Sequence, residues 1–157
     1  MLEEKLLIMK HQEGFINFIE SLKKVDPDVL KRPIDEGKWS ILEIVAHFIA
    51  WDEFIIEKRL PILFQTQSAF EQAPDEQFLN DRVPSLVETF ASLDIINRVM
   101  ELRQIIYDQL DKIEEEKWLE SIPFGHQTTS LHHYFDHQKD HDIGHIDQIN
   151  MALNRFK

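Results

Sequence analysis

The chain of 157 residues has no cysteine, only four glycines, and few positive charges. The absence of cysteine excludes disulfide bonds, cysteine-ligated zinc, iron–sulfur clusters and a cysteine nucleophile. Lysine and arginine number 17 against 29 aspartates and glutamates, for a formal net charge of −12. A nucleic-acid groove needs clustered positive charge. We therefore expect no nucleic-acid partner, and any metal site must consist of imidazole and carboxylate groups.

The sequence also has no long hydrophobic run. Its first residues, Met-Leu-Glu-Glu-Lys, are acidic where a signal peptide would be basic. The most apolar stretch, Ile41 to Trp51, contains Glu43 and His47 and is too short to span a membrane. These features predict a cytoplasmic protein without a membrane partner.

Six prolines divide the chain into windows free of proline: 1–26, 34–60, 85–122 and 124–157. Proline and the residue before it both disfavour helix continuation, so each window can hold one helix. Apolar residues recur at helical period in all four windows. Four amphipathic helices need one another to bury their apolar faces. The pattern predicts an all-α fold, a four-helix bundle that forms a single domain over residues 1–157.

Several helix boundaries can be predicted from capping residues. Ser40 and Glu43 form a capping box at the start of the second helix. Either Thr129 or Ser130 caps the fourth helix, after a Pro-Phe-Gly turn. The third helix begins at a second Ser-x-x-Glu box (residues 85–88) or at Ser92. We see no signal for a β-strand.

A long connection is expected between the second and third helices. The segment 62–84 is polar, contains two prolines and is longer than most loops of helical bundles. It either crosses the end of the bundle or carries short helical turns of its own.

Histidines are concentrated near the C-terminus, where six of the eight follow residue 125. His141 and His145 lie one helical turn apart on one face, a spacing at which two imidazoles can bind one metal ion. Ile149 and Ala152 share that face, so we expect it to point toward the core. The third ligand must come from another helix, and His47 lies on the apolar side of the second helix. We interpret these three histidines as a metal site; the alternative is that they are ordinary core and surface histidines.

The remaining candidates have weaker signals. Arg103 interrupts the apolar stripe of the third helix, so it either neutralises a buried carboxylate, lies at the rim, or clamps an anionic substrate. We expect His11 and His126 to be ordinary surface residues. The side chains expected at the rim of the site are His132, His133 and His137, with His137 as an outer contact. The acidic residues that are candidates to orient the ligands are Asp52, Glu53 and Asp142.

Two segments of the chain resemble the signature of the DinB/YfiT-like superfamily of metal-binding four-helix bundles. That signature is a Trp-Ser/Thr-x-x-Glu helix start with a histidine four residues after the glutamate, then His-x-x-x-His before Gln-Ile. The matching segments are Trp39 to His47 and His141 to Ile149. Their order fits the superfamily pattern over nearly the whole chain.

The resemblance implies that His47, His141 and His145 bind one divalent ion, commonly zinc or nickel, with a coordination position left for water or substrate. The superfamily includes metal-dependent S-transferases that use low-molecular-weight thiols such as bacillithiol or mycothiol, and hydrolase-like proteins. Although the superfamily is named after DinB, the resemblance does not imply DNA binding.

The leading hypothesis is therefore a metal-dependent transferase or hydrolase that acts on small electrophilic molecules. Because the chain lacks cysteine, any thiol must arrive as a separate small molecule. No catalytic residue other than the metal ligands can be assigned. The alternative is a non-enzymatic bundle that binds metal or serves as a scaffold for a homodimer, since acidic bundles of this type often pair.

Overall fold

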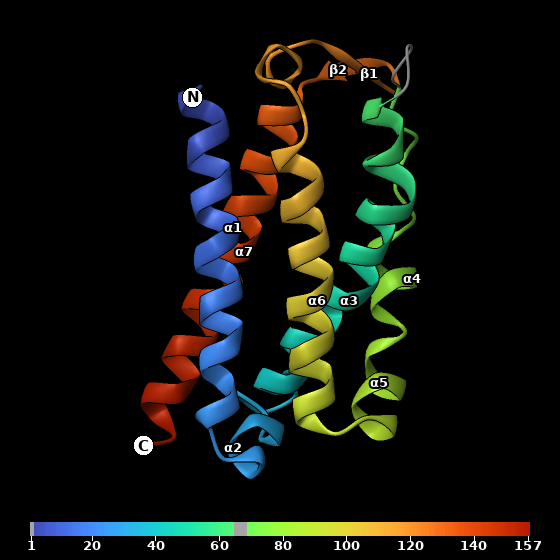
Figure 1. The fold of residues 1–157 in the computed structure, drawn as a ribbon. Helices are drawn as coiled ribbons and strands as arrows, with labels where there is room; N and C mark the ends of the chain where they lie inside the picture. Colours follow the sequence, from blue (N-terminus) through green and yellow to red (C-terminus); the bar gives the residue numbers. More distant parts are fainter. Residues whose placement is uncertain (1, 65–68) are drawn as a thin grey trace.

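The computed structural model describes residues 2–64 and 69–157 of the chain. Four long helices form the body of the molecule (Figure 1): α1 (Glu3–Ser21), α3 (Ile41–Phe54), α6 (Ser92–Asp111) and α7 (Leu131–Arg155). Helix α6 packs against α1 and α3, and α7 packs against α1 and, over a shorter stretch, against α3. The prediction of an all-α four-helix bundle is confirmed.

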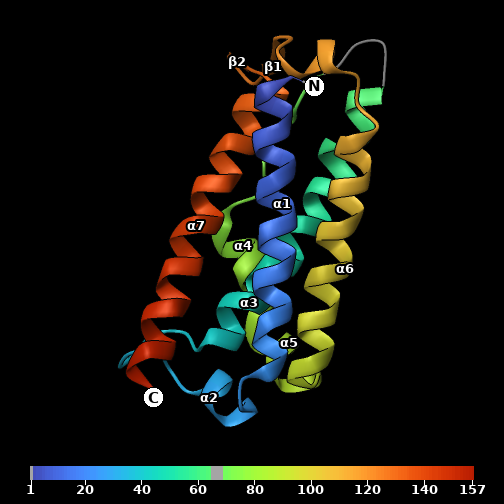
Figure 2. The ribbon, with the colours of Figure 1, turned by 60° about the vertical axis from the view of Figure 1, so that its left-hand side comes forward.

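The direction of the helices explains the long connection. Helices α1 and α7 run down the view of Figure 1, whereas α3 and α6 both run up it. Two consecutive parallel helices require the chain to return along the full length of the bundle. The segment between them does so on the outside of the bundle, with two short helices, α4 (Glu76–Asn80) and α5 (Val83–Thr89) (Figures 1 and 2). The connection thus carries helical turns of its own; its residues 65–68 lie outside the described residues.

The predicted cap of α3 is present in full. The Ser40 hydroxyl accepts a hydrogen bond from the Glu43 amide, and the Glu43 carboxylate accepts one from the Ser40 amide, both at 3.1 Å. These two bonds satisfy backbone donors that have no partner within the helix. They fix the start of α3, whose capping residue Ser40 lies seven residues before His47.

The caps also decide the two boundaries that the sequence left open. Ser130, rather than Thr129, caps α7 by accepting a hydrogen bond from the amide of His133 at 3.1 Å. Helix α6 begins at Ser92, and the second Ser-x-x-Glu box lies in the separate helix α5.

The prediction that the chain contains no strand is wrong. A small antiparallel hairpin of β1 (Ile122–Phe124) and β2 (Gln127–Thr129) precedes α7. Gly125 has a φ of 62° in the turn, a conformation that favours glycine. Strands of three residues are too short to show the alternation of polar and apolar residues by which strands are recognised.

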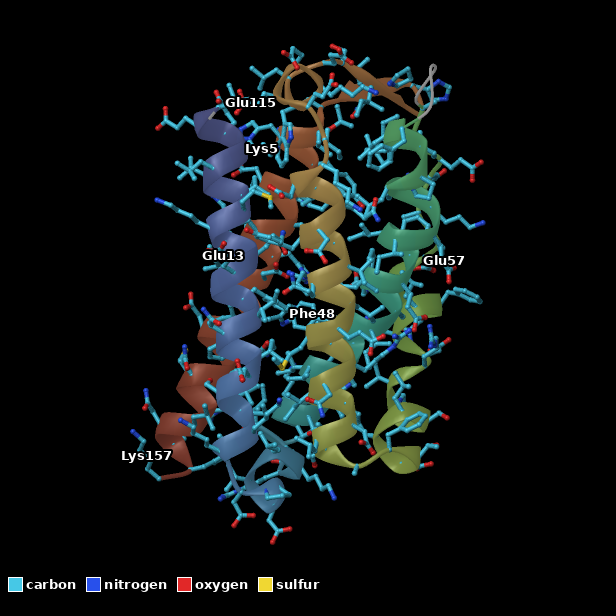
Figure 3. The ribbon with its side chains drawn as sticks, viewed as in Figure 1. Lys5, Glu13, Phe48, Glu57, Glu115 and Lys157 are labelled. Atoms are coloured by element: carbon cyan, nitrogen blue, oxygen red, sulfur yellow. The ribbon has the colours of Figure 1, made fainter. Side chains whose placement is uncertain are left out.

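At the hairpin end of the bundle, polar contacts attach α1 to the end of α6. The buried ammonium of Lys5 donates to the carbonyls of Asp111 and Ile113, both at 3.0 Å. The carboxylate of Glu115 accepts a hydrogen bond from the amide of Leu2 at 2.8 Å. Lys5 and Glu115 are labelled near each other in Figure 3. A cation at a helix C-terminus satisfies free carbonyls and complements the helix dipole.

The apolar interior consists of two clusters. One surrounds Phe15, Ile19 and Ile41, and the other surrounds Trp118 and Phe135 nearer the hairpin. Among the described residues, no helix is both long enough and apolar enough to cross a membrane.

Candidate metal centre

Helices α3 and α7 bring the three predicted histidines together. His47 is buried on α3, His145 is half-buried on α7, and His141 is exposed one turn before it. One ring nitrogen from each lies within 4.8 Å of the others. The ring centre of His145 is 4.6 Å from that of His47 and 4.6 Å from that of His141. Their role as metal ligands stays a prediction, but the arrangement it requires is present.

Hydrogen bonds orient two of the three imidazoles. Nδ1 of His47 donates to the carbonyl of Ile44, so its Nε2 keeps the free lone pair. That Nε2 atom is buried and has no hydrogen-bond partner. Nδ1 of His145 is 3.1 Å from the side-chain oxygen of Gln148, which can only accept, so Nε2 of His145 is also left with its lone pair.

These observations fit a bound divalent ion. A buried polar atom without a partner costs about 1–3 kcal/mol, and such atoms in native proteins usually have an identifiable reason. Histidine ligands characteristically donate their second ring nitrogen to a carbonyl or carboxylate, as His47 and His145 do. A metal ion would give Nε2 of His47 its missing partner.

The protonation states are those that a metal requires. Burial lowers the pKa of His47 to about 4, and the neighbouring His145 and His141 lower it further against the opposing hydrogen bond to Ile44. Burial and the proximity of His145 also lower the pKa of His141. Both rings are therefore neutral at neutral pH, and a neutral imidazole is the form that binds metal.

The expectation that the histidine face of α7 points into the core is only partly correct. Ile149 and Ala152 are buried, but His141 is exposed. The cluster therefore has one buried member on α3 and an accessible side on α7.

A cavity of about 300 Å³ adjoins His141 between α3 and α7. Five aromatic side chains line it: Phe48, Trp51, Phe54, Phe124 and Tyr134. Phe48 lies inside the bundle (Figure 3), with its ring centre 4.4 Å from that of His47 and 5.7 Å from that of His145. His137 also lines the cavity, and its role as an outer contact of the site stays a prediction; His133 is exposed and His132 is half-buried.

A buried polar network centred on Arg103 lies beside the cavity. Its guanidinium binds the carboxylate of Asp52 through Nε at 3.0 Å and Nη2 at 3.2 Å. It binds the carboxylate of Asp142 through Nη1 at 2.7 Å and Nη2 at 3.3 Å. Nη1 also donates to Gln12 at 3.2 Å. Arg103 therefore neutralises buried carboxylates, and its five N–H groups leave none free to clamp an anionic substrate.

The network sets the charge of its two acids in different ways. Burial raises the pKa of Asp52 to about 6, although Arg103 opposes the shift. Burial also tends to raise the pKa of Asp142, but Arg103 and the hydrogen bond from His11 outweigh it, so the net shift is downward.

The prediction for His11 is wrong. Nε2 of His11 lies 2.8 Å from the carboxylate of Asp142, and only 10% of the side chain is exposed. The fully buried Gln12 was not predicted either; its amide donates to Gln138 on α7 at 3.0 Å. The sequence signal that could have identified Gln12 is its position as a polar residue at helical spacing among the apolar residues of α1. His126 is exposed as expected.

The acidic residues do not orient the ligands as expected. Asp52 and Asp142 bind Arg103, and Glu53 pairs with Arg82 at 2.8 Å and Arg98 at 3.5 Å on the surface. In residues 2–64 and 69–157, the partners of the ligand rings are the carbonyl of Ile44 and the amide of Gln148.

Comparisons with known proteins agree with this architecture. No family model and no curated protein matches the sequence. Among solved structures, the chain is similar to YfiT from Bacillus subtilis, described as a probable metal-dependent hydrolase with an unusual four-helix bundle topology. The TM-score is 0.75 at 17% identity, over 99% of this chain and 90% of YfiT.

Two further structures have the same fold. An uncharacterized protein from Clostridium difficile 630 matches with a TM-score of 0.72 at 12% identity, over 98% of both chains. A protein from Streptococcus pneumoniae matches with a TM-score of 0.72 at 14% identity, over 98% of this chain and 92% of that one. Identity at this level establishes the fold alone. The chain shares the four-helix-bundle fold of YfiT, in agreement with the resemblance seen in the sequence.

Proposed function

We propose that the protein is a metal-dependent enzyme that acts on small electrophilic molecules, as a hydrolase or as a thiol S-transferase. The observation that carries the proposal is the buried Nε2 atom of His47, which lacks a partner and belongs to a cluster with the accessible His141 and His145. The description of YfiT as a probable metal-dependent hydrolase supports the same conclusion.

The number of ligands favours a catalytic rather than a structural ion. Structural zinc sites are closed by four protein ligands, whereas catalytic sites have three and an open position. A divalent ion, zinc or nickel, would act as a Lewis acid. It would lower the pKa of a bound water or thiol toward neutral pH.

The chain's own residues prepare the site for this chemistry. The Ile44 carbonyl and Gln148 fix the orientation of His47 and His145. Phe48 packs against all three imidazoles, with ring centres 4.4–6.5 Å away. The adjoining cavity, with its five aromatic side chains, offers apolar contacts to a small molecule.

The two reaction types differ in the source of the nucleophile. The chain has no cysteine, so the sulfur of a transfer reaction would come from a separate low-molecular-weight thiol. The proposal includes a cytoplasmic location and a small-molecule substrate. With a net charge of −12, it includes no nucleic-acid partner.

Metal content tests the first part of the proposal. The protein is purified without a histidine tag, loaded with Zn²⁺ or Ni²⁺, and compared with His141→Ala and with the control His133→Ala, an exposed histidine of the same helix. We expect about one bound ion per chain in the wild type and in His133→Ala, and a clear loss in His141→Ala, because three ligands are needed. A wild type that binds neither metal contradicts the proposal.

Activity tests the second part. The metal-loaded protein is incubated with an activated ester to detect hydrolysis, and with monochlorobimane and a panel of small thiols to detect transfer. We expect one of the two rates to exceed that of His141→Ala and of the free metal. No excess in either assay favours the alternative, a metal-binding scaffold without catalytic activity.

A further inference from the structure

A second arginine lies at the end of the cavity nearer the hairpin. Arg59 is in a π-helical turn, Ile55–Arg59, that directly follows α3, and it lines the cavity although only 1% of the residue is exposed. Four aromatic rings surround its guanidinium carbon. Their centres lie 4.8 Å (Phe54), 5.0 Å (Phe70), 5.1 Å (Phe124) and 5.6 Å (Tyr134) away.

The charge of Arg59 has no counter-ion among the residues that the structure describes. Its Nη1 donates to the backbone carbonyl of Glu71 and the Tyr134 hydroxyl is a further partner of the guanidinium, whereas its buried Nε has no hydrogen-bond partner. None of the ion pairs in the described part of the chain includes it. Buried cations are normally paired, and a buried N–H without a partner is rare.

The carboxylates of the cavity are not available to Arg59. Asp52 and Asp142 are both bound by Arg103, the other arginine of the cavity. Glu76 also lines the cavity but is exposed to solvent. The cavity thus contains one fully paired arginine and one arginine with a free donor.

We propose that Arg59 binds an anionic group, a carboxylate or phosphate, of the small molecule that occupies this cavity. The guanidinium supplies the counter-charge and N–H donors that suit both groups. The surrounding rings would contact the apolar part of the same molecule. π-Helical turns of this kind frequently occur at functional sites.

The position of Arg59 also limits the size of the ligand. Tyr134, which contacts Arg59, and His141, at the candidate metal centre, are seven residues apart on α7, or about 10 Å at the rise of an α-helix. A ligand that reaches both ends would extend along about this length of α7. The part of this inference that concerns a reactive group at the candidate metal centre rests on the proposed function. Binding of the anionic group by Arg59 does not require the metal.

Matched probes test the proposal by calorimetry. The probes are phenylbutyrate, phenylethyl phosphate and the neutral phenylbutanol, titrated into metal-loaded and metal-stripped protein. We expect at least one anion to bind the wild type about tenfold or more tightly than the alcohol, with or without metal. Whichever anion binds better identifies the carboxylate or the phosphate as the preferred group.

Variants assign the preference to Arg59. In Arg59→Met we expect the anions and the alcohol to bind equally, whereas Arg59→Lys should retain part of the preference. Arg98→Met is the control, because Arg98 is exposed and pairs with Glu53 and Glu101, and it should retain the full preference. Circular dichroism and thermal unfolding establish that each variant is folded.

Three results would overturn the proposal. They are the absence of any anion preference in the wild type, a preference that survives in Arg59→Met, and a preference that disappears when the metal is removed. The wild-type comparison decides the question even where a variant does not fold. Because it is also made on metal-stripped protein, failure of the proposed catalytic function would leave the expected result unchanged.

Discussion

The three histidines of the candidate metal centre differ in environment, and this difference has a consequence for stability. His47 is buried and held by the Ile44 carbonyl, whereas His141 is exposed. A buried imidazole without a counter-ion must stay neutral for the protein to fold, so its titration is linked to the free energy of unfolding. Partial burial and the neighbouring His145 also lower the pKa of His141, so its titration contributes a linkage of the same sign.

The first prediction concerns the pH dependence of the metal-free protein. The pKa of His47 falls from 6.5 to about 4 on folding. Its contribution to stability is therefore present above pH 6.5 and is lost as the pH falls toward 4, by up to about 1.4 kcal/mol per pH unit. We expect His47→Leu to lack this loss, as measured by urea unfolding in the presence of a chelator.

Asp52 has a pKa shift of the opposite sign, and its effect is common to the wild type and His47→Leu, so the comparison of the two isolates His47. Burial raises the pKa of Asp52 from 3.8 to about 6, so its contribution is present below pH 3.8 and is lost as the pH rises through 6. Relative to the wild type, His47→Leu should become less stable as the pH rises from 4 to 6, because it lacks the gain in stability that His47 gives the wild type over this range. The control His133→Leu should follow the wild type, and parallel profiles for His47→Leu and the wild type would refute the assignment.

At the level of secondary structure, the sequence predicts those elements that carry their own local signals. The start of α3 is marked by Ser40 and Glu43, and the start of α7 by Ser130. The hairpin at 122–129 has no such signal, because its strands are three residues long. The π-helical turn that contains Arg59 is equally invisible, since it depends on packing rather than on residue type.

The second prediction tests the capping box. Ser40→Ala removes the hydroxyl that accepts from the Glu43 amide, and it should lower the free energy of unfolding by about 1 kcal/mol. Ser21→Ala is a matched control, because the Ser21 hydroxyl binds the Phe18 carbonyl at the exposed C-terminal end of α1. It should change stability by less than about 0.5 kcal/mol. Urea unfolding compares the two, and equal losses would mean that the box does not stabilise α3.

At the level of the whole molecule, the sequence predicts the histidine cluster but not the network beside it. His141 and His145 are one turn apart, and His47 was the only histidine of its helix, so few combinations were available. The partners of Arg103 lie 91, 51 and 39 residues away on α1, α3 and α7. Their meeting depends on the directions of the four helices, and the parallel course of α3 and α6 cannot be deduced from apolar spacing (Figure 2).

The third prediction follows from the position of this network, which joins all four long helices through one guanidinium. Arg103→Met would leave Asp52 without its counter-charge and Asp142 with His11 as its remaining partner, and both carboxylates are buried, with side chains only 1% exposed. Removing one partner of a buried ion pair typically costs about 3–5 kcal/mol. We expect a loss of this size at pH 7 by urea unfolding, whereas Arg98→Met, which breaks exposed pairs, should cost at most about 1 kcal/mol.

The pH dependence of this loss separates a charge effect from a loss of packing. Arg103 also lies 3.6 Å from the centre of the Phe15 ring, so Arg103→Met changes apolar contacts as well as charge. Protonation neutralises the two stranded carboxylates, so a charge effect should shrink as the pH is lowered toward 4, while a packing effect should stay constant. A loss that does not depend on pH would mean that Arg103 stabilises the bundle mainly through Phe15. A variant as stable as the wild type at pH 7 would mean that the network does not hold the four helices together.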